Sequence, residues 1–201
     1  QRIGGHELVQ LLIESTGLKT YGAGEWVDQP HGIRARRRWR KLHIAVDAGS
    51  QEIVASDLTG DDVGDVTLLP DLLDQVDGSV DAVIADGTYD GQPVDDAVAA
   101  RHPDADVIIP PRSTSVPTET AASQRDRHIK VIQEHGRRGW QRQTGYGRRS
   151  LVETAMFRYK TIIGKSLHAR TLSNQRTEAK IGCKILNRMT SLGMPVSVRI
   201  K

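Results

Sequence analysis

The sequence predicts an α/β fold in which helices flank a mixed sheet of five strands. Three strand-like segments come first along the chain, and strand-like and helix-like segments alternate after them. Consecutive strands favour antiparallel pairing and strands separated by helices favour parallel pairing, so together they predict a mixed sheet. With 201 residues, of which 37% are hydrophobic, the chain can form one sizeable core.

The N-terminal part of the chain predicts the first three strands. The apolar run at residues 9–13 is typical of a buried strand, which we expect to end at Glu14. Residues 17–35 are polar and rich in glycine, which favours a loop or an irregular hairpin. Apolar side chains alternate along residues 36–47, and residues 52–58 follow after a short turn, so these two segments predict a β-hairpin.

Helices and strands alternate in the middle of the chain. Apolar side chains at helical spacing predict a helix at residues 65–76, and residues 92–100 predict a second, shorter one. Apolar runs bounded by turn residues predict strands at residues 80–85 and 105–109. The fourth strand therefore ends directly before Asp86.

The C-terminal part of the chain predicts helices. Residues 112–145 are polar and basic and predict a small insertion, with a helix near residues 123–135. Residues 148–163 predict an amphipathic helix, and Ser173 or Asn174 can cap one last helix. This order of elements is that of the ribonuclease-H-like fold, with the basic insertion before the acidic helix that follows the fifth strand.

Charge is divided unevenly along the chain. Residues 1–111 carry 9 Lys and Arg against 20 Asp and Glu, a net charge of −11, whereas residues 112–201 carry 19 against 5, a net charge of +14. The acidic half suggests a cation site and the basic half a nucleic-acid partner; the alternative is charge complementarity within the molecule. The basic run at residues 34–41, where Trp39 could stack on a base, is a second nucleic-acid candidate, and its alternative is a strand edge blunted by positive charge.

Several classes of protein are disfavoured by the composition. No apolar run approaches the ~20 residues of a membrane span, and no secretory signal is present, so we expect a cytoplasmic protein without membrane partners. The single cysteine, Cys183, excludes intramolecular disulfides and cysteine-rich zinc sites. Because the chain starts at Gln1 rather than Met, we also expect that an upstream part is missing.

Three acidic residues stand where this fold can gather a site. Glu14 follows the first apolar run, Asp86 follows the fourth strand, and Glu153 lies in the helix after the fifth strand. Converging carboxylates are suitable ligands for Mg²⁺ or Mn²⁺, and two such ions can cleave a phosphodiester by activating water or a 3′-hydroxyl. For Asp86 the alternative is an ordinary Asp-Gly turn. Asp47, at the end of the second strand, is a weaker candidate for the first acid.

One face of the predicted helix at residues 148–163 combines a carboxylate with cations. At about 100° per residue, Arg149, Glu153, Lys160 and the preceding Tyr146 fall within about 60° of one another, opposite the apolar side chains. Such a face can offer a metal ligand and phosphate contacts to a polyanion. The alternative is a solvated i,i+4 pair of Arg149 and Glu153.

The spacing of these four residues resembles the Tyr-x₂-Arg-x₃-Glu-x₆-Lys signature of one group of bacterial insertion-sequence transposases, within the DDE superfamily. Further segments are similar to the first-acid strand and loop, the second strand, the second-acid segment and the fifth strand of that family, namely residues 13–26, 37–47, 85–91 and 109–112. The resemblance covers nearly the whole chain.

The resemblance implies that residues 1–201 form a ribonuclease-H-like catalytic domain. Such a domain would cleave the ends of a transposable element and join the freed 3′-hydroxyl to target DNA, with Mg²⁺ as cofactor and a homodimer or higher oligomer assembled on the DNA. The residues that match the family's site are Glu14, Asp86 and Glu153 as metal ligands, and Tyr146, Arg149 and Lys160 as contacts to DNA.

Two departures from the family pattern leave other hypotheses open. The family usually has Asp where this chain has Glu14, and the additional methylene moves the carboxylate by ~1.5 Å, whereas catalytic geometry tolerates about 0.5 Å. We also expect that the N-terminal helical region that recognises transposon ends is missing. The alternative function is therefore a truncated transposase remnant that folds and binds DNA without catalysis. A structure-selective nuclease of the same fold is a third hypothesis, which the Tyr-Arg-Lys part of the signature disfavours.

Overall fold

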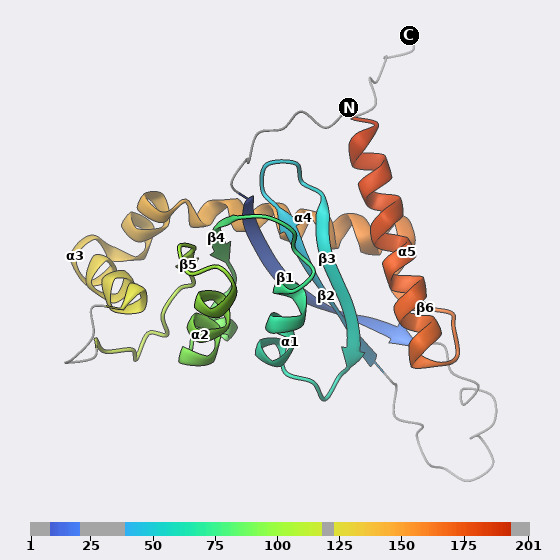
Figure 1. The fold of residues 1–201 in the computed structure, drawn as a ribbon, viewed down its shortest axis with the longest axis horizontal. Helices are drawn as coiled ribbons and strands as arrows, with labels where there is room; N and C mark the ends of the chain where they lie inside the picture. Colours follow the sequence, from blue (N-terminus) through green and yellow to red (C-terminus); the bar gives the residue numbers. More distant parts are fainter. Residues whose placement is uncertain (1–8, 21–38, 118–122, 194–201) are drawn as a thin grey trace.

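The computed structural model describes residues 9–20, 39–117 and 123–193, and its centre is a mixed β-sheet (Figure 1). The five main strands lie in the order β3-β2-β1-β4-β5. Strands β1, β2 and β3 are antiparallel neighbours, whereas β4 and β5 run parallel to β1. The predicted ribonuclease-H-like sheet is therefore confirmed. The strands are β1 (Val9–Thr20), β2 (Trp39–Asp47), β3 (Ile53–Gly60), β4 (Val80–Ile84), β5 (Asp106–Ile108) and β6 (Ser166–Leu167).

Helices cover both faces of the sheet. The α-helices are α1 (Asp65–Leu73), α2 (Gln92–Arg101), α3 (Gln124–Thr144), α4 (Ser150–Arg158) and α5 (Leu172–Ser191). Three short helical segments adjoin them, the 3₁₀ turns η1 (Gly87–Tyr89) and η2 (Tyr146–Arg149) and the π-helical turn η3 (Tyr159–Ile163). Among the residues that the structure describes, no helix is both long and apolar enough to cross a membrane.

The two hydrophobic cores divide the side chains of β1 by parity. Leu11 and Ile13 belong to the core that α1 and α2 close on one face of the sheet. Leu12 belongs to the core on the other face, together with Val152 and Met156 of α4. Successive side chains of a strand point to opposite faces. The next even-numbered position of β1, which is residue 14, therefore faces α4.

Strand β1 is longer than the sequence predicts. We expected it to end at Glu14 and residues 17–35 to form a loop or an irregular hairpin, but the strand continues to Thr20. Its polar half stays extended because it pairs with β2 as far as Lys19 and with the additional short strand β6 at Lys19 and Thr20. Tertiary pairing thus overrides the low strand propensity of this segment. The rest of the predicted loop, and residues 34–38 of the basic run, lie outside the described residues.

The predicted helix at residues 148–163 is three consecutive segments with different winding. The 3₁₀ turn η2 leads into α4, and the π-helical turn η3 follows it. A π-helical turn holds more residues than the 3.6 of an α-helix, so the regular 100° spacing fails after Arg158. Ile162, which that spacing assigns to the apolar face, is accordingly exposed.

The basic insertion contains a longer helix than predicted. The helix expected near residues 123–135 continues as α3 to Thr144, with a kink at Gly136, whose φ of 68° lies in the left-handed region. Glycine adopts this conformation without steric cost, so two helical stretches meet there at a kink.

The last helix begins earlier than predicted. Thr171, rather than Ser173 or Asn174, is the N-cap of α5, and its Oγ1 accepts a hydrogen bond from the backbone N–H of Asn174 at 3.3 Å. Helix α1 ends at Leu73, three residues before the predicted end at residue 76. Both differences concern helix boundaries and leave the predicted order of elements unchanged.

Candidate active site

Strand register brings the first two acidic residues to the same edge of the sheet. Leu12 of β1 is the partner of Ile84 in the parallel neighbour β4. Glu14 and Asp86 each lie two residues further along, and adjacent strands are about 4.8 Å apart, so the two carboxylates leave the sheet side by side. Glu14 lies inside β1 rather than at its end, contrary to our expectation.

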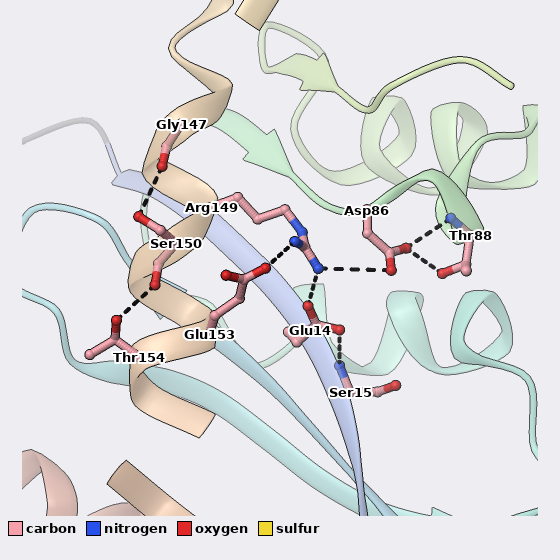
Figure 2. Close-up of polar contacts among 9 residues, drawn as sticks. All are labelled: Glu14, Ser15, Asp86, Thr88, Gly147, Arg149, Ser150, Glu153 and Thr154. Carbon is pink, nitrogen blue, oxygen red and sulfur yellow. Dashed lines mark hydrogen bonds and ion pairs between the residues drawn. The ribbon is translucent and has the colours of Figure 1, made fainter. Parts of the chain in front are cut away.

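Helix α4 brings the third acid over the same edge. Its buried side chains Val152, Ala155 and Met156 pack on the sheet, and this packing fixes the rotation of the helix. Glu153 is exposed on the side of α4 that faces Glu14, as Figure 2 shows. Carboxylates from a strand, a loop and a helix thus meet although they are far apart in the sequence.

The guanidinium of Arg149 lies among the three carboxylates (Figure 2). Its Nη2 atom donates a short hydrogen bond to Glu14 Oε2 and lies 3.8 Å from Asp86 Oδ2. Its Nη1 atom donates to Glu153 Oε1 at 2.5 Å. The i,i+4 pair of Arg149 and Glu153, which the sequence analysis gave as the alternative to a functional face, exists as one part of a four-residue cluster. We call Glu14, Asp86, Glu153 and Arg149 the acid-arginine cluster.

The other oxygens of Glu14 and Asp86 are held by the backbone. Glu14 Oε1 accepts a hydrogen bond from the N–H of Ser15 at 3.1 Å. Asp86 is the N-cap of η1, and its Oδ1 accepts from the N–H of Thr88 at 2.8 Å and from the Thr88 hydroxyl. One oxygen of each carboxylate is therefore fixed, and the other is directed into the cluster. Our sequence analysis did not assign a role to Thr88, although Asp-x-Thr is a typical turn and capping pattern.

Burial and neighbouring charge both act on Glu14. Its side chain is 17% exposed, and desolvation by burial is the main cause that raises its pKa above the ordinary value. The guanidinium of Arg149 opposes this increase, while the carboxylates of Asp86 and Glu153 add to it. The cluster therefore has more negative charge than one arginine neutralises.

Two residues of the predicted DNA contact set make no polar contact with the acids. The ring of Tyr146 packs on the buried Trp140 with centroids 5.0 Å apart, and burial is the main cause that raises its pKa. Lys160 lies in η3, after the point where the regular helical spacing fails. Within the described residues, no hydrogen bond or ion pair joins the side chain of either residue to Glu14, Asp86 or Glu153.

Asp47, the alternative first acid, lies away from this cluster. It pairs with Leu11 in β2–β1 register, whereas Glu14 pairs with Ile44, which separates the two acids by about 10 Å along the strands. Residues directly opposite each other share a face, so Asp47 belongs to the face of α1 and α2. Its oxygens accept hydrogen bonds from Gly49 N at 3.1 Å and from Ser50 N at 2.9 Å, which suits a role in the β2–β3 turn.

The carboxylates of Glu14, Asp86 and Glu153 are suitable ligands for a divalent cation if the guanidinium of Arg149 leaves them. Carboxylate oxygens are the ligands that Mg²⁺ and Mn²⁺ prefer, and three of them are directed to one place. With the guanidinium between them, no group of three or more His, Cys, Asp or Glu side chains in the described ranges is arranged to hold a metal ion. Arg149 contacts one oxygen of each acid, so a metal ion could bind these three oxygens only in place of the guanidinium.

A comparison of the sequence with protein-family models matches residues 5–188 to the family described as the transposase DDE domain. The matched residues include the whole acid-arginine cluster and every strand of the sheet. The match does not distinguish between groups of insertion sequences.

Proposed function

The chain belongs to the transposase DDE domain family, whose function is DNA transposition, and we propose that it is the catalytic domain that cuts and joins DNA strands at the ends of an insertion sequence. The observation that supports this most strongly is the convergence of Glu14, Asp86 and Glu153 on one guanidinium. The two joined reactions would be hydrolysis at the element's end and attack of the freed 3′-hydroxyl on target DNA.

Glu14, Asp86 and Glu153 would hold one or two Mg²⁺ ions, for which Mn²⁺ could substitute. When bound, these ions supply activation of the attacking oxygen and stabilisation of the leaving oxygen. The protein contributes rigid placement of the carboxylates, because backbone hydrogen bonds fix one oxygen of Glu14 and one of Asp86. In hydrolysis the water oxygen bonds to phosphorus, the bond from phosphorus to the 3′-oxygen breaks, and the 3′-oxygen leaves as a hydroxyl.

The cationic residues of the signature would hold the DNA backbone. The planar fork of Arg149 can donate two parallel hydrogen bonds to a phosphate. The ammonium of Lys160 lies one helical segment further along and would contact a neighbouring phosphate. Tyr146 is held against Trp140 and would add a hydroxyl to the same surface. Because phosphate contacts position DNA without reading its sequence, these residues would set register rather than end specificity.

The proposal extends to partners and location. Transposon ends and target DNA would be bound together, which requires a homodimer or higher oligomer assembled on DNA. The single domain over residues 1–201 would supply the chemistry, with the basic insertion at residues 112–145 adding contacts to the DNA backbone. Acting on chromosomal DNA would place the protein in the cytoplasm at the nucleoid.

The second candidate function is a remnant that binds DNA without cutting it. The observation that favours it is Glu14 in place of the family's usual Asp. Both functions predict DNA binding, so cleavage alone distinguishes them.

The test is cleavage of DNA that carries the ends of the element encoding this chain, using the full-length protein with Mg²⁺. We expect strand cuts at the ends that leave a 3′-hydroxyl, and none with Glu153→Gln, which keeps the size of the side chain but removes its charge. Cuts that persist in Glu153→Gln or in excess chelator would contradict the catalytic proposal. No cuts by the wild type and by Glu14→Asp would favour the remnant.

A further inference from the structure

Arg149 differs from the other cations of the described residues in how many acids it contacts. The other Lys and Arg ion pairs there each involve a single carboxylate, namely Lys41–Asp65, Arg101–Asp74, Arg125–Asp90 and Arg176–Asp57. The guanidinium of Arg149 contacts carboxylates from three separate elements. It therefore links β1, the loop after β4 and helix α4 through one side chain.

The charges in the cluster do not balance. One guanidinium lies among three carboxylates, which leaves two negative charges when all three acids are ionised. A divalent cation would be attracted by this excess, but it would need the oxygens that Arg149 now contacts. The guanidinium and the metal ion therefore compete for Glu14 Oε2, Asp86 Oδ2 and Glu153 Oε1.

The arginine is placed so that it can leave the cluster. The side chain of Arg149 is 18% exposed, so part of it reaches solvent. Arg149 itself lies at the junction of η2 and α4. Its Nε atom is buried without a hydrogen-bond partner among the described residues, so the present contacts leave one donor unsatisfied. Outside the cluster, the guanidinium needs another oxyanion that accepts two parallel hydrogen bonds from it, and a DNA phosphate is such a group.

We propose that Arg149 is a latch that couples DNA binding to metal binding at the proposed active site. In the DNA-free protein the guanidinium occupies the carboxylate cluster and competes with the metal ion. A DNA phosphate takes up the guanidinium and so frees the three acids for metal. This inference rests on the proposed function, and it adds that divalent ions bind tightly only once DNA is in place.

The latch makes a reciprocal prediction. If DNA raises the affinity for metal by some factor, metal must raise the affinity for DNA by the same factor. Couplings of this kind are commonly on the order of 5- to 150-fold, and we expect ~10-fold here. A benefit of this coupling is that the protein does not assemble a cutting centre before it holds its substrate.

The experiment measures Mn²⁺ binding by the full chain from the electron paramagnetic resonance signal of free Mn²⁺. The wild type and Arg149→Gln are titrated with and without a short DNA duplex, and Mn²⁺ bound by the duplex alone is subtracted. Arg148→Gln is the matched control, because it removes the same charge from the neighbouring position. The side chain of Arg148 is exposed and donates to Gln10 rather than to the acids.

Without DNA, we expect Arg149→Gln to bind Mn²⁺ ~10-fold more tightly than the wild type, and Arg148→Gln to resemble the wild type. The duplex should raise the Mn²⁺ affinity of the wild type ~10-fold and leave that of Arg149→Gln unchanged. Equal Mn²⁺ affinity of Arg149→Gln and Arg148→Gln would overturn the latch. So would a duplex effect of the same size in both the wild type and Arg149→Gln.

A second variant protects the test against misfolding. If Arg149→Gln does not give a cooperative thermal melt, Arg149→Lys keeps the charge but cannot bridge several carboxylates, and its Mn²⁺ affinity should exceed that of the wild type. An affinity equal to or below the wild type would overturn the latch. If the wild type cuts DNA with Mg²⁺ but the Arg149 variants gain no Mn²⁺ affinity, the latch is wrong and the proposed function stands. If the wild type binds no Mn²⁺ in the presence of DNA and cuts no DNA, the proposed function is wrong as well.

Discussion

Among single residues, Glu14 matters most for the proposed function, because the family usually has Asp at this position. Its carboxylate contacts Arg149 and the N–H of Ser15, so it takes part in the cluster despite its length. A metal ion, however, requires a donor oxygen within about 0.5 Å of its productive position. If Glu14 is a metal ligand, as we propose, the additional methylene would act on catalysis more than on the assembly of the site.

We predict that Glu14→Asp increases the rate of DNA cleavage. A displacement on the order of 1 Å can cost ~10²-fold in rate, so a shorter side chain that restores the family's usual ligand should gain up to that factor. The measurement is single-turnover cleavage of a transposon end with Mg²⁺, with Glu14→Gln as an inactive control. Slower cleavage by Glu14→Asp would mean that Glu14 is a ligand to which the rest of this site is adapted.

The raised pKa of Glu14 also predicts a pH dependence of stability. Burial is its main cause, and the excess of carboxylates adds to it. A carboxyl whose pKa is raised by folding favours the folded state below the ordinary value near 4.5, and this contribution is lost as the pH rises through the raised value. Glu14→Gln should therefore gain stability relative to the wild type as the pH increases from about 4 to 7. Thermal melts in chelator measure this difference, and a pH-independent difference would contradict the cause.

At the scale of elements, most of the sheet and the meeting of the acids could be predicted. The strand order places β4 beside β1, and the register of Leu12 with Ile84 then brings Asp86 beside Glu14. Alternation along β1 and the apolar face of α4 determine which acids face each other. These depend on hydrophobic pattern and topology, both of which the sequence carries.

Other features depend on tertiary contacts that the local sequence does not encode. The polar half of β1 stays extended because β2 and β6 pair with it. The π-helical turn that contains Lys160 could not be predicted from a regular period. We expected Arg149 to contact phosphate, and its position among three carboxylates required the geometry of three elements at once.

An ion pair connects the basic insertion to the loop that carries Asp86. Asp90 is 3% exposed and accepts hydrogen bonds from Arg125 Nε at 2.7 Å and Nη2 at 3.2 Å, and from the N–H of Arg112 at 3.0 Å. These contacts hold the start of α3 and the segment after β5 against the turn four residues beyond Asp86.

We predict that Asp90→Ala destabilises the fold by about 1–3 kcal/mol, because it leaves the partly buried guanidinium of Arg125 and a backbone donor without their acceptor. The control is Asp74→Ala, which breaks a similar two-contact pair with Arg101 at an exposed place and should have a much smaller effect. Urea denaturation of both variants gives the comparison. Equal losses would show that the Asp90 pair is no more than a surface contact.

At the scale of the whole molecule, the separation of charge suggests how metal and DNA act on the fold. The three acids of the cluster come from the two halves, Glu14 and Asp86 from the acidic residues 1–111 and Glu153 from the basic residues 112–201. The three carboxylates repel one another, and this repulsion opposes the docking of α4, which packs on β1 and β2. A cation that binds all three should therefore stabilise the whole fold.

We predict that millimolar Mg²⁺ or Mn²⁺ raises the melting temperature of the wild type when a DNA duplex is present. A ligand at 100 times its dissociation constant adds about 2.7 kcal/mol to the free energy of unfolding, which is a shift of several degrees. Glu153→Gln, with a weakened site, should show a smaller shift of the melting temperature. An excess of chelator should abolish the shift in the wild type. Equal shifts in both proteins would mean that the ions stabilise the complex through the DNA rather than through the cluster.

The last prediction concerns the basic half of the chain as a DNA-binding surface. Residues 112–201 have a net charge of +14, and exposed cations lie along the second half of α3, at Arg137, Arg138 and Arg142. Binding through phosphates releases counterions, so the affinity for any duplex should fall ~10³-fold between 50 and 200 mM salt if about six phosphates are contacted.

Two variants test this surface further. Lys160→Ala should weaken binding of all sequences alike and lower the salt slope by about 1, whereas Glu153→Ala should leave DNA binding largely intact because it removes a negative charge. Fluorescence anisotropy across a salt series measures both, and an affinity independent of salt would rule out an electrostatic interface on this half of the molecule.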